Sequence, residues 1–489
     1  MAIAAVPVAI LVAIYLNSYL RLPYADHDPT MYAIIGHAMV HDGVVPYRGV
    51  FDHKPVLLYG FYGLWSLPGR GWPGEFTVLA LGCCVLIAAI GARFTRGAFA
   101  VALSMLVLGG ARFAVLAGNA ECVYLPLILG ALILMALGRE RERPVLLVGA
   151  FALAAVAVNT NYLAGPSLLI PSAIAVLAPG PRRRPDPSRE RADDGIAGSE
   201  PARSRPPPAT AVRAVATRAG AALAGLSIGL LVALVPFIWS STAIWTDYLR
   251  PQLAYLRHYG APGVVRLQAT AMFALFGLVL SPVLLLWHRR PVAVLSRWRR
   301  SLLFWWAISA WLACLASGHP FPHYFLLALA PVAIMASCLW RHWSRRWLAI
   351  GLVPLLVLSA VGGWHDVVRN QRLGRALAQA DFERLRSLAG DRPVLSIEAS
   401  DVPFFMAGLQ PLGHYIFPGH VRTVFGTGAS AFYLSALARR PDAVLIPPGW
   451  CGSPDALPPV CERLQRDFRP AAEAPGTDGF VLLLRRNGR

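Results

Sequence analysis

The sequence predicts an α-helical membrane protein that crosses the bilayer many times and ends in a small α/β domain. Three observations predict this class. Of the 489 residues 56% are hydrophobic and only 15% are charged, and the mean hydropathy is +0.52. Apolar stretches of about 20 residues, the length that crosses a bilayer core, recur along the chain. After residue 364 this pattern stops, and short apolar runs alternate with polar segments.

Eleven apolar stretches are long enough to be membrane spans, and none of them has Asp, Glu, Lys or Arg at its centre. The first stretch lacks a basic n-region and a small-residue cleavage site, so we expect an anchor and not a removed signal peptide. The predicted spans are residues 3–20, 76–92, 97–116, 121–138, 144–162, 164–179, 219–240, 266–287, 301–317, 324–339 and 347–364.

Basic residues gather in alternate loops, and this sets the expected orientation. The basic groups lie at 93–96, 139–143, 180–218, 288–300 and 341–346. Because cytoplasmic loops carry the Lys/Arg excess, we expect a multi-pass protein of the inner (plasma) membrane with a cytoplasmic N-terminus and a periplasmic or extracytoplasmic C-terminal domain. The net charge of +19 then faces anionic headgroups of the bilayer and does not indicate a nucleic-acid partner.

The chain therefore divides into a transmembrane domain, 1–364, and an extracytoplasmic α/β domain, 365–489. Within the first, residues 21–75 form an outer loop, and the Pro- and Arg-rich segment 180–218 is expected to be a disordered cytoplasmic linker. The second is expected to open with an amphipathic helix.

That helix is predicted over 366–389, and short buried strands are predicted over 392–399, 442–448 and 479–486. Cys451 and Cys461 lie ten residues apart in this domain. An oxidising compartment would allow a disulfide between them, and the sequence leaves both states open.

The outer loop holds the densest group of polar and aromatic residues, YADHDPTMYAIIGHAMVHDGVVPYRGVFDHKPVLLYGFYGLWSL (24–67). Asp28 followed by Pro29 predicts the N-cap and first position of a helix. Apolar residues at helical spacing after it indicate a helix along the membrane surface. A second amphipathic helix is predicted to begin near Lys54. The loop residues Asp26, Asp42 and Asp52 are expected to be solvated charges.

Lys54 is the only lysine among the chain's 45 basic residues. It can be a cation at the interface whose stem lies along apolar surface. It can also mark a place where a compact ammonium is needed and a planar guanidinium does not serve.

The motifs of this loop resemble those of the GT-C glycosyltransferases, in the branch with lipid A aminoarabinosyltransferase and protein O-mannosyltransferases. The resemblance rests on Asp28 with Tyr32 four residues later, then PYR, FDHKP and a Tyr-rich apolar helix. It continues weakly at GNAECVYLPL (118–127) and GHPFPHYFLLALAP (318–331). The family usually has Asp-Glu where this chain has Asp28-Pro29, which leaves the role of the second acid open.

This resemblance implies a multi-span enzyme that transfers a sugar from a polyprenyl-phosphate donor to a hydroxyl of a glycolipid, glycan or protein. It makes Asp28 the general base and Lys54, with Arg48, the cations that stabilise the lipid phosphate. His323 and Tyr324 are expected to contact phosphate or sugar, or else to belong to an aromatic belt. A direct displacement with one base would invert the anomeric carbon.

Glu121 is expected to line the same cavity and bind acceptor hydroxyls, or else to be a charge at a helix start. The remaining cavity-lining candidates are Tyr32, His53, Tyr59 and Arg257. For Arg257, in the loop 245–260, anchoring at the interface is the alternative. Arg112 can pair with Glu121. We expect no cofactor, although a divalent cation stays open, because one Asp and one Glu far apart in sequence do not define a metal site.

Two other functions remain in view. A transporter or flippase of a lipid-linked sugar would show inverted repeats and ionisable residues near the bilayer midplane, and neither is visible in the sequence. A non-catalytic scaffold of the same fold is compatible with Pro29 in place of the family's second acid. The charges at the outer interface favour the enzyme.

Overall fold

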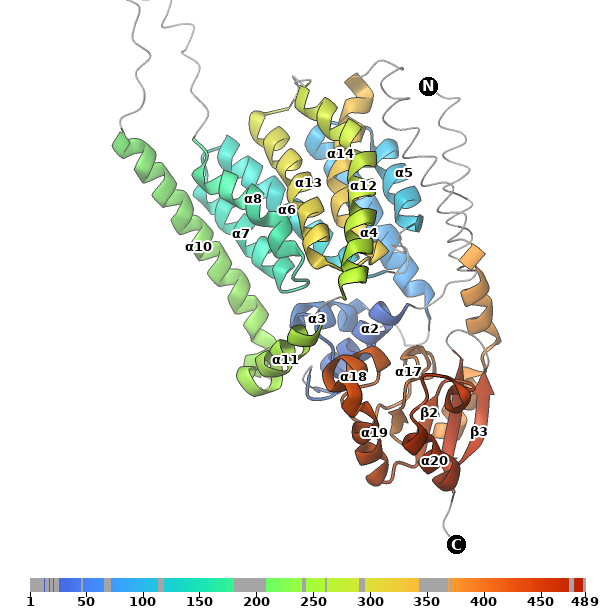
Figure 1. Cartoon of the computed structure of the whole chain (residues 1–489). Helices are drawn as coiled ribbons and strands as arrows, with labels where there is room; N and C mark the ends of the chain where they lie inside the picture. Colours follow the sequence, from blue (N-terminus) through green and yellow to red (C-terminus); the bar gives the residue numbers. More distant parts are fainter. Residues whose placement is uncertain are drawn as a thin grey trace, which may run out of the picture.

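The computed structural model describes residues 26–44, 47–65, 72–112, 118–179, 208–239, 243–259, 262–289, 295–342, 371–474 and 479–486, with a few isolated residues besides. The described chain forms a bundle of apolar helices, a pair of short helices across one end of it, and a C-terminal α/β domain beside that pair (Figure 1). The predicted spans 3–20 and 347–364 lie outside the described residues.

Helices of the bundle run side by side over most of its height (Figure 1). They are α4 (Gly74–Thr95), α5 (Phe99–Arg112), α6 (Glu121–Glu140), α7 (Pro144–Val158), α8 (Ala164–Leu177), α10 (Pro208–Trp239), α12 (Gly263–Arg289), α13 (Arg297–Ser317) and α14 (Phe325–His342). In the described part of the chain, five of these, α4, α6, α10, α12 and α13, are long and apolar enough to cross a membrane. The helices match the nine predicted spans that fall on described residues.

The predicted linker 180–218 extends too far. Residues 208–218 are already helical, because α10 begins at Pro208 and continues into its apolar stretch. Proline is favoured at the first position of a helix, and the sequence that follows it is rich in alanine, the strongest helix former. The earlier part of the predicted linker lies outside the described residues.

Two short helices, α2 (His27–His41) and α3 (Val56–Trp65), lie across the end of the bundle, as predicted for the outer loop (Figure 1). They cross at two glycines. A Cβ on Gly36 would overlap the backbone of Tyr59 and Gly63, and a Cβ on Gly63 would overlap the backbone of Gly36. The close approach buries Pro29 to Gly36 on α2, so this helix is packed between neighbours and not merely laid on a surface.

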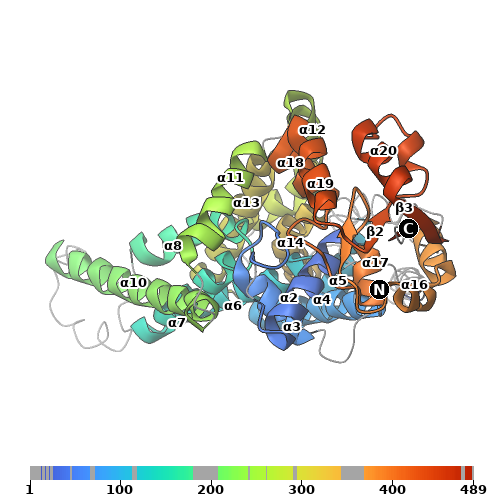
Figure 2. The same ribbon diagram turned by 90° about the horizontal axis from the view of Figure 1, so that it is seen from below.

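Between α10 and α12 the chain forms a π-helical turn, η2 (Ile244–Leu249), and α11 (Arg250–His258). This segment lies at the same end of the bundle as α2 and α3. The 3₁₀ turn η3 (Pro322–Tyr324) precedes α14. Figure 2 shows the end-on view, in which α2 and α3 lie between α11 on one side and α17 on the other.

The C-terminal domain is built on a four-stranded sheet with strand order β1-β2-β4-β3. The strands β1 (Val394–Ser396) and β2 (Ala443–Ile446) are parallel, while β4 (Phe480–Arg485) is antiparallel to both β2 and β3 (Phe468–Ala474). The helical elements of this domain are α16 (Phe382–Ala389), α17 (Val402–Ala407), α18 (Pro418–Phe425), η4 (Gly426–Gly428), α19 (Ala429–Ala438), η5 (Trp450–Gly452) and α20 (Pro458–Asp467).

Three strands were predicted and β3 was missed. Its sequence, FRPAAEA, contains charges and a proline, and its pairing with β4 is irregular between Pro470 and Ala472. Such residues are tolerated at the edge of a sheet, where a strand has a partner on one side only. The continuous helix predicted over 366–389 is also wrong, because Asp381 interrupts it and caps α16 by accepting a hydrogen bond from the Arg384 N–H at 2.8 Å.

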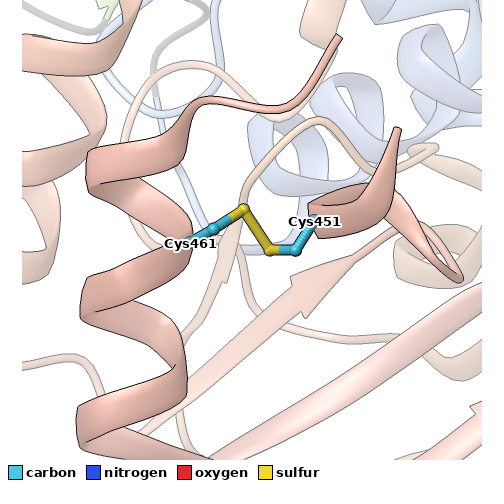
Figure 3. Close-up of a disulfide and its surroundings, with 2 residues drawn as sticks. All are labelled: Cys451 and Cys461. Carbon is cyan, nitrogen blue, oxygen red and sulfur yellow. A yellow bond between two sulfur atoms is a disulfide. The ribbon is translucent and has the colours of Figure 1, made fainter. Parts of the chain in front are cut away.

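The two cysteines of this domain form a disulfide. Cys451 lies in η5 and Cys461 in α20, and their Cα atoms are 5.6 Å apart (Figure 3). The bond joins two segments that the sheet alone does not connect. Among the described residues, Cys83, Cys84, Cys122, Cys314 and Cys338 are buried and outside any disulfide, as expected for small core residues.

The crossing of α2 and α3 gives a direct test. Gly36→Ala places a methyl group against backbone atoms that cannot move aside, so we expect a loss of about 1–3 kcal/mol in the free energy of unfolding. The matched control is Gly82→Ala on α4, where an added Cβ meets nothing within 4 Å. The melting temperature of the purified protein should fall for Gly36→Ala and hold for Gly82→Ala. Equal melting temperatures for the two variants would contradict the crossing.

Candidate active site

Helix α2 begins two residues earlier than predicted. Its N-cap is Asp26, whose carboxylate accepts a hydrogen bond from the His27 N–H at 2.9 Å, and not Asp28. The Thr30 backbone N–H reinforces this turn by donating to the backbone oxygen of Asp26 at 3.2 Å. Asp28 therefore lies in the first turn of α2, where the helix dipole favours a negative charge, and its carboxylate is not used as the cap.

Lys54 lies directly before α3 and is 8% exposed, so it is not an interfacial cation with a hydrated head. Tyrosine hydroxyls hold its backbone: Tyr47 donates to the Lys54 carbonyl at 2.7 Å, and Tyr59 accepts from the Lys54 N–H at 3.0 Å. Burial alone would lower the pKa of Lys54, but nearby carboxylates, Asp28 foremost, raise it above its usual value. The ammonium therefore stays charged inside a group of acids.

Asp52 was expected to be a solvated loop charge, and that expectation is wrong, because it is 3% exposed. Its carboxylate accepts hydrogen bonds from the His53 N–H at 2.7 Å and the Tyr59 hydroxyl at 2.9 Å. Two imidazole nitrogens also lie close to Oδ1, His53 Nδ1 at 3.0 Å and His420 Nε2 at 3.4 Å. Burial opposes its charge, but the two histidines lower the pKa of Asp52 well below its usual value.

Glu121 begins α6 and is 1% exposed. The Tyr124 hydroxyl donates to its Oε1 at 3.2 Å, whereas its Oε2 is buried and has no hydrogen-bond partner among the described residues. The Tyr32 hydroxyl and the Asn119 side-chain oxygen are likewise buried and unpaired. Unsatisfied buried polar atoms are rare in proteins, and a functional role is one of the explanations for them.

The tyrosine and carboxylate side chains near Lys54 lie close enough to shift one another's pKa values. Burial raises the pKa of Tyr32, and the charges of Asp28, Asp52 and Glu121 raise it further. Burial also raises the pKa of Asp26, and Asp28 adds to this, while His27 and His323 oppose it. Helix α2, the loop at Asp52, the start of α6 and the turn η3 thus place their ionisable groups in one shared electrostatic environment.

Tyr259 extends this group towards η3. Burial and the neighbouring Tyr324 raise its pKa, Lys54 lowers it, and Asp28 raises it. His319, which precedes η3, has its Nε2 atom 3.0 Å from the Tyr259 backbone oxygen. His323 packs edge-on against Tyr324, with ring centroids 4.8 Å apart. His323 and Tyr324, the two residues of η3 that the sequence analysis singled out, therefore lie beside these ionisable groups.

We define the acid–lysine cluster by the residues that these contacts and charges connect. Its members that were predicted from the sequence are Asp28, Tyr32, His53, Lys54, Tyr59, Glu121, His323 and Tyr324. Its further members are Asp26, Asp52, Asn119, Tyr259 and His420.

Two predicted residues have other surroundings in the structure. Arg48 is 52% exposed at its side chain, and its Nε donates to Asp247 of η2 at 2.9 Å. Arg257 is exposed on α11, and no contact joins it to the acid–lysine cluster within the described residues. The side chain of Arg112 lies outside the described residues, and the contact seen at Glu121 is with Tyr124.

The segment 243–259 covers the cluster from one side. Gln252 donates to the Asp52 backbone oxygen at 3.1 Å, and Tyr255 stacks on the His53 ring with centroids 4.8 Å apart. The Tyr248 hydroxyl is 2.8 Å from that of Tyr162 in the α7–α8 connection. Together with the Arg48–Asp247 ion pair, these contacts join α11 to the outer loop.

One group of side chains can hold a metal ion. Ligand atoms of Asp52, His53 and His420 all lie within 4.8 Å of one another. One carboxylate and two imidazoles are a donor set that zinc accepts when a water supplies the fourth ligand. The same three side chains also satisfy one another as a buried charge network, so the expectation of no cofactor stays a prediction.

The C-terminal domain contributes directly to this end of the bundle. Asp401 accepts from Thr30 Oγ1 at 2.6 Å and lies 2.7 Å from His27 Nδ1. The Phe51 N–H donates to the His414 backbone oxygen at 2.7 Å. Sequence reasoning missed Asp401 and His420, and no local pattern marks them, because their place is set by the docking of a domain far along the chain.

No family model and no curated protein matches this sequence. Solved structures do match this chain in fold. The chain is similar to the crystal structure of ArnT from Cupriavidus metallidurans in the apo state, with 11% identity, a TM-score of 0.55, and 99% of this chain and 97% of that chain covered. For ArnT from Cupriavidus metallidurans bound to undecaprenyl phosphate, the identity is 13%, the TM-score 0.57, and the coverage 99% and 98%. This chain has the ArnT fold. The predicted resemblance to GT-C membrane glycosyltransferases is therefore confirmed for the fold.

The contacts of the Asp52 carboxylate with His53, Tyr59 and His420 can be tested for their contribution to stability. Asp52→Asn leaves the His53 and His420 rings without their anion, so we expect the free energy of unfolding to fall by roughly 3 kcal/mol, as when one partner of a buried ion pair is removed. The control is Asp42→Asn, an exposed residue at the C-terminus of α2 that caps with its backbone only. Thermal unfolding should separate the two variants, and an unchanged melting temperature for Asp52→Asn would contradict the network.

Proposed function

We propose that this protein is a membrane glycosyltransferase that transfers a sugar from a polyprenyl-phosphate donor to an acceptor hydroxyl at the outer face of the membrane. One observation carries the proposal. The chain's single lysine is buried at the membrane end of the C-terminal domain, and Asp28, on the first turn of α2, is the foremost charge that raises its pKa. The ArnT fold and an ArnT structure bound to undecaprenyl phosphate support this choice of donor.

Sugar transfer from a lipid phosphate needs a base and a cation, and the cluster offers both. Asp28 takes the proton from the acceptor hydroxyl as the oxygen attacks the anomeric carbon. The bond from that carbon to the phosphate oxygen breaks, and negative charge grows on the departing lipid phosphate. Lys54 faces that charge with a compact ammonium held in a site of low dielectric, where its stabilising effect is larger than in water.

The remaining polar groups have roles that follow from their surroundings. The unpaired oxygens of Glu121 and Tyr32 are available to accept or donate hydrogen bonds to acceptor or sugar hydroxyls. His323 and Tyr324 lie beside them on η3. Attack by the acceptor on the face opposite the phosphate inverts the anomeric carbon. Arg48, through its pair with Asp247, holds the segment 243–259 near the donor.

The charge distribution supports the orientation that places this site outside the cell. At the opposite end of the bundle, arginines line a cavity of about 690 Å³ between α4, α6 and α13. All four of these arginines, Arg93, Arg96, Arg141 and Arg299, belong to the basic loops assigned to the cytoplasm. Under the positive-inside rule, these arginines support an orientation in which the acid–lysine cluster and the disulfide lie on the oxidising, outer side.

The decisive experiment is mass spectrometry of polyprenyl-phosphate sugars in cells that lack the protein. We expect one lipid-linked sugar to accumulate, to fall when wild type is restored, and to stay high with Asp28→Asn at matched membrane levels, since removal of a general base costs about 10²–10⁴-fold in rate. Asp42→Asn, at the other end of α2, should behave as wild type. If no such lipid changes, or if Asp28→Asn clears the pool, the enzyme assignment is wrong.

A second test concerns the charge at position 54. Lys54→Arg keeps the charge but inserts a larger planar group into a site where the residue is 8% exposed, so we expect turnover to fall at least tenfold. Lys54→Met, which keeps the length without the charge, should fall further. Clearance of the accumulated lipid by each variant, followed over time, measures both effects, and full activity of Lys54→Arg would remove the argument for an ammonium.

A further inference from the structure

The carboxylate of Asp401 is turned away from its own helix. Asp401 is the N-cap residue of α17, a position at which aspartate ordinarily binds the first N–H groups of the helix. Here its side chain makes no such capping bond. Both carboxylate oxygens instead meet α2, and the residue has no exposed surface.

The two contacts of Asp401 lie on either side of Asp28. Oδ1 is 2.7 Å from His27 Nδ1, and Oδ2 accepts from the Thr30 hydroxyl at 2.6 Å. His27 directly precedes Asp28, and Thr30 lies two residues after Asp28. Asp401 therefore contacts the first turn of α2 on both sides of Asp28 in the sequence. Hydrogen bonds to an ionised carboxylate are short and about twice as strong as those between neutral groups.

Other contacts keep the C-terminal domain in register with this turn. The ring centroids of His27 and Phe417 are 5.4 Å apart. Those of Phe405 in α17 and Phe76 in α4 are 5.2 Å apart. His420 reaches Asp52, on the Lys54 side of the cluster. The domain therefore touches both the turn that carries Asp28 and the segment that carries Lys54.

We propose that Asp401 is a positioning residue, through which the C-terminal domain sets the direction of the Asp28 carboxylate by way of His27 and Thr30. This inference rests on the proposed function, because it assigns Asp28 as the base. Asp28 has no capping bond of its own in the described chain, so its direction depends on the turn in which it lies. A misplacement of about 1 Å in a reacting group can cost 10²-fold in rate.

The test compares Asp401→Asn with Asp381→Asn in the full-length protein. Asp381 is also an N-cap aspartate of the C-terminal domain, but it is exposed and caps its own helix, and asparagine caps equally well. Two quantities are measured: the rate at which membranes consume the lipid-linked sugar that accumulates in cells without the protein, and the affinity of the purified protein for undecaprenyl phosphate.

We expect Asp401→Asn to lower the rate by about 10–100-fold, with the affinity for undecaprenyl phosphate changed less than twofold, because Asp401 acts on the base and not on the phosphate site. Asp381→Asn should match wild type in both. Thr30→Val removes one of the two contacts from the α2 side and should give a smaller loss. Combined with Asp401→Asn, it should add little, since the two residues act through one interaction.

A rate within twofold of wild type for Asp401→Asn overturns the inference. So does an equal loss of rate and affinity with a lower melting temperature, which describes a structural support only, and so do fully multiplicative effects of Asp401→Asn and Thr30→Val. If Asp401→Asn does not fold, Thr30→Val with the same two measurements decides. An inactive Asp28→Asn beside a normal Asp401→Asn rejects this inference alone, whereas an active Asp28→Asn rejects the proposed function.

Discussion

The burial of the Asp52 carboxylate is the constraint on which the end of the helix bundle that carries α2 and α3 depends. A buried anion is costly unless several donors surround it, and the donors here come from different parts of the chain. His53 and Tyr59 belong to the outer loop and α3, and His420 belongs to the C-terminal domain. Gln252 of α11 donates to the backbone oxygen of the same residue. Satisfying the polar groups of this one residue thus requires the loop, α11 and the C-terminal domain to meet.

This meeting creates the surroundings of Lys54. An isolated ammonium with 8% exposure would lose its proton, yet the acids around Lys54 raise its pKa. The acids benefit in turn, because a buried cation offsets the repulsion among them. The result is a compact group of charges, enclosed on one side by α11 and α18 and on the other by α17, in which an incoming phosphate can compete with carboxylates for one ammonium.

Much of this arrangement could be predicted from the sequence, for reasons that particular elements make clear. The spans follow from the length of apolar stretches, and three strands follow from the runs VLS, AVLI and FVLLLR. Edge strand β3 could not be recognised, because it contains Arg469, Pro470 and Glu473. Asp28, Lys54 and Glu121 were placed by family resemblance, which records chemistry that spacing alone does not.

What the sequence could not supply is contact between distant elements. His27 and Asp401 are 374 residues apart, and neither lies in a motif that points to the other. Asp52 looked like an ordinary loop charge, since its burial depends on His420 and α11. Asp28 was predicted as the N-cap because Asp-Pro is a common helix start, yet Asp26 caps the helix and the Asp28 carboxylate takes no part in the cap.

The central claim is that the acid–lysine cluster binds a lipid phosphate through Lys54. The most direct measurement is the affinity of the purified full-length protein for undecaprenyl phosphate and for undecaprenol, which has the same chain without the phosphate. We predict that wild type binds the phosphate at least tenfold more tightly, and that Lys54→Met removes this difference while leaving the affinity for undecaprenol unchanged. Equal affinities of the wild type for the two lipids would contradict the account.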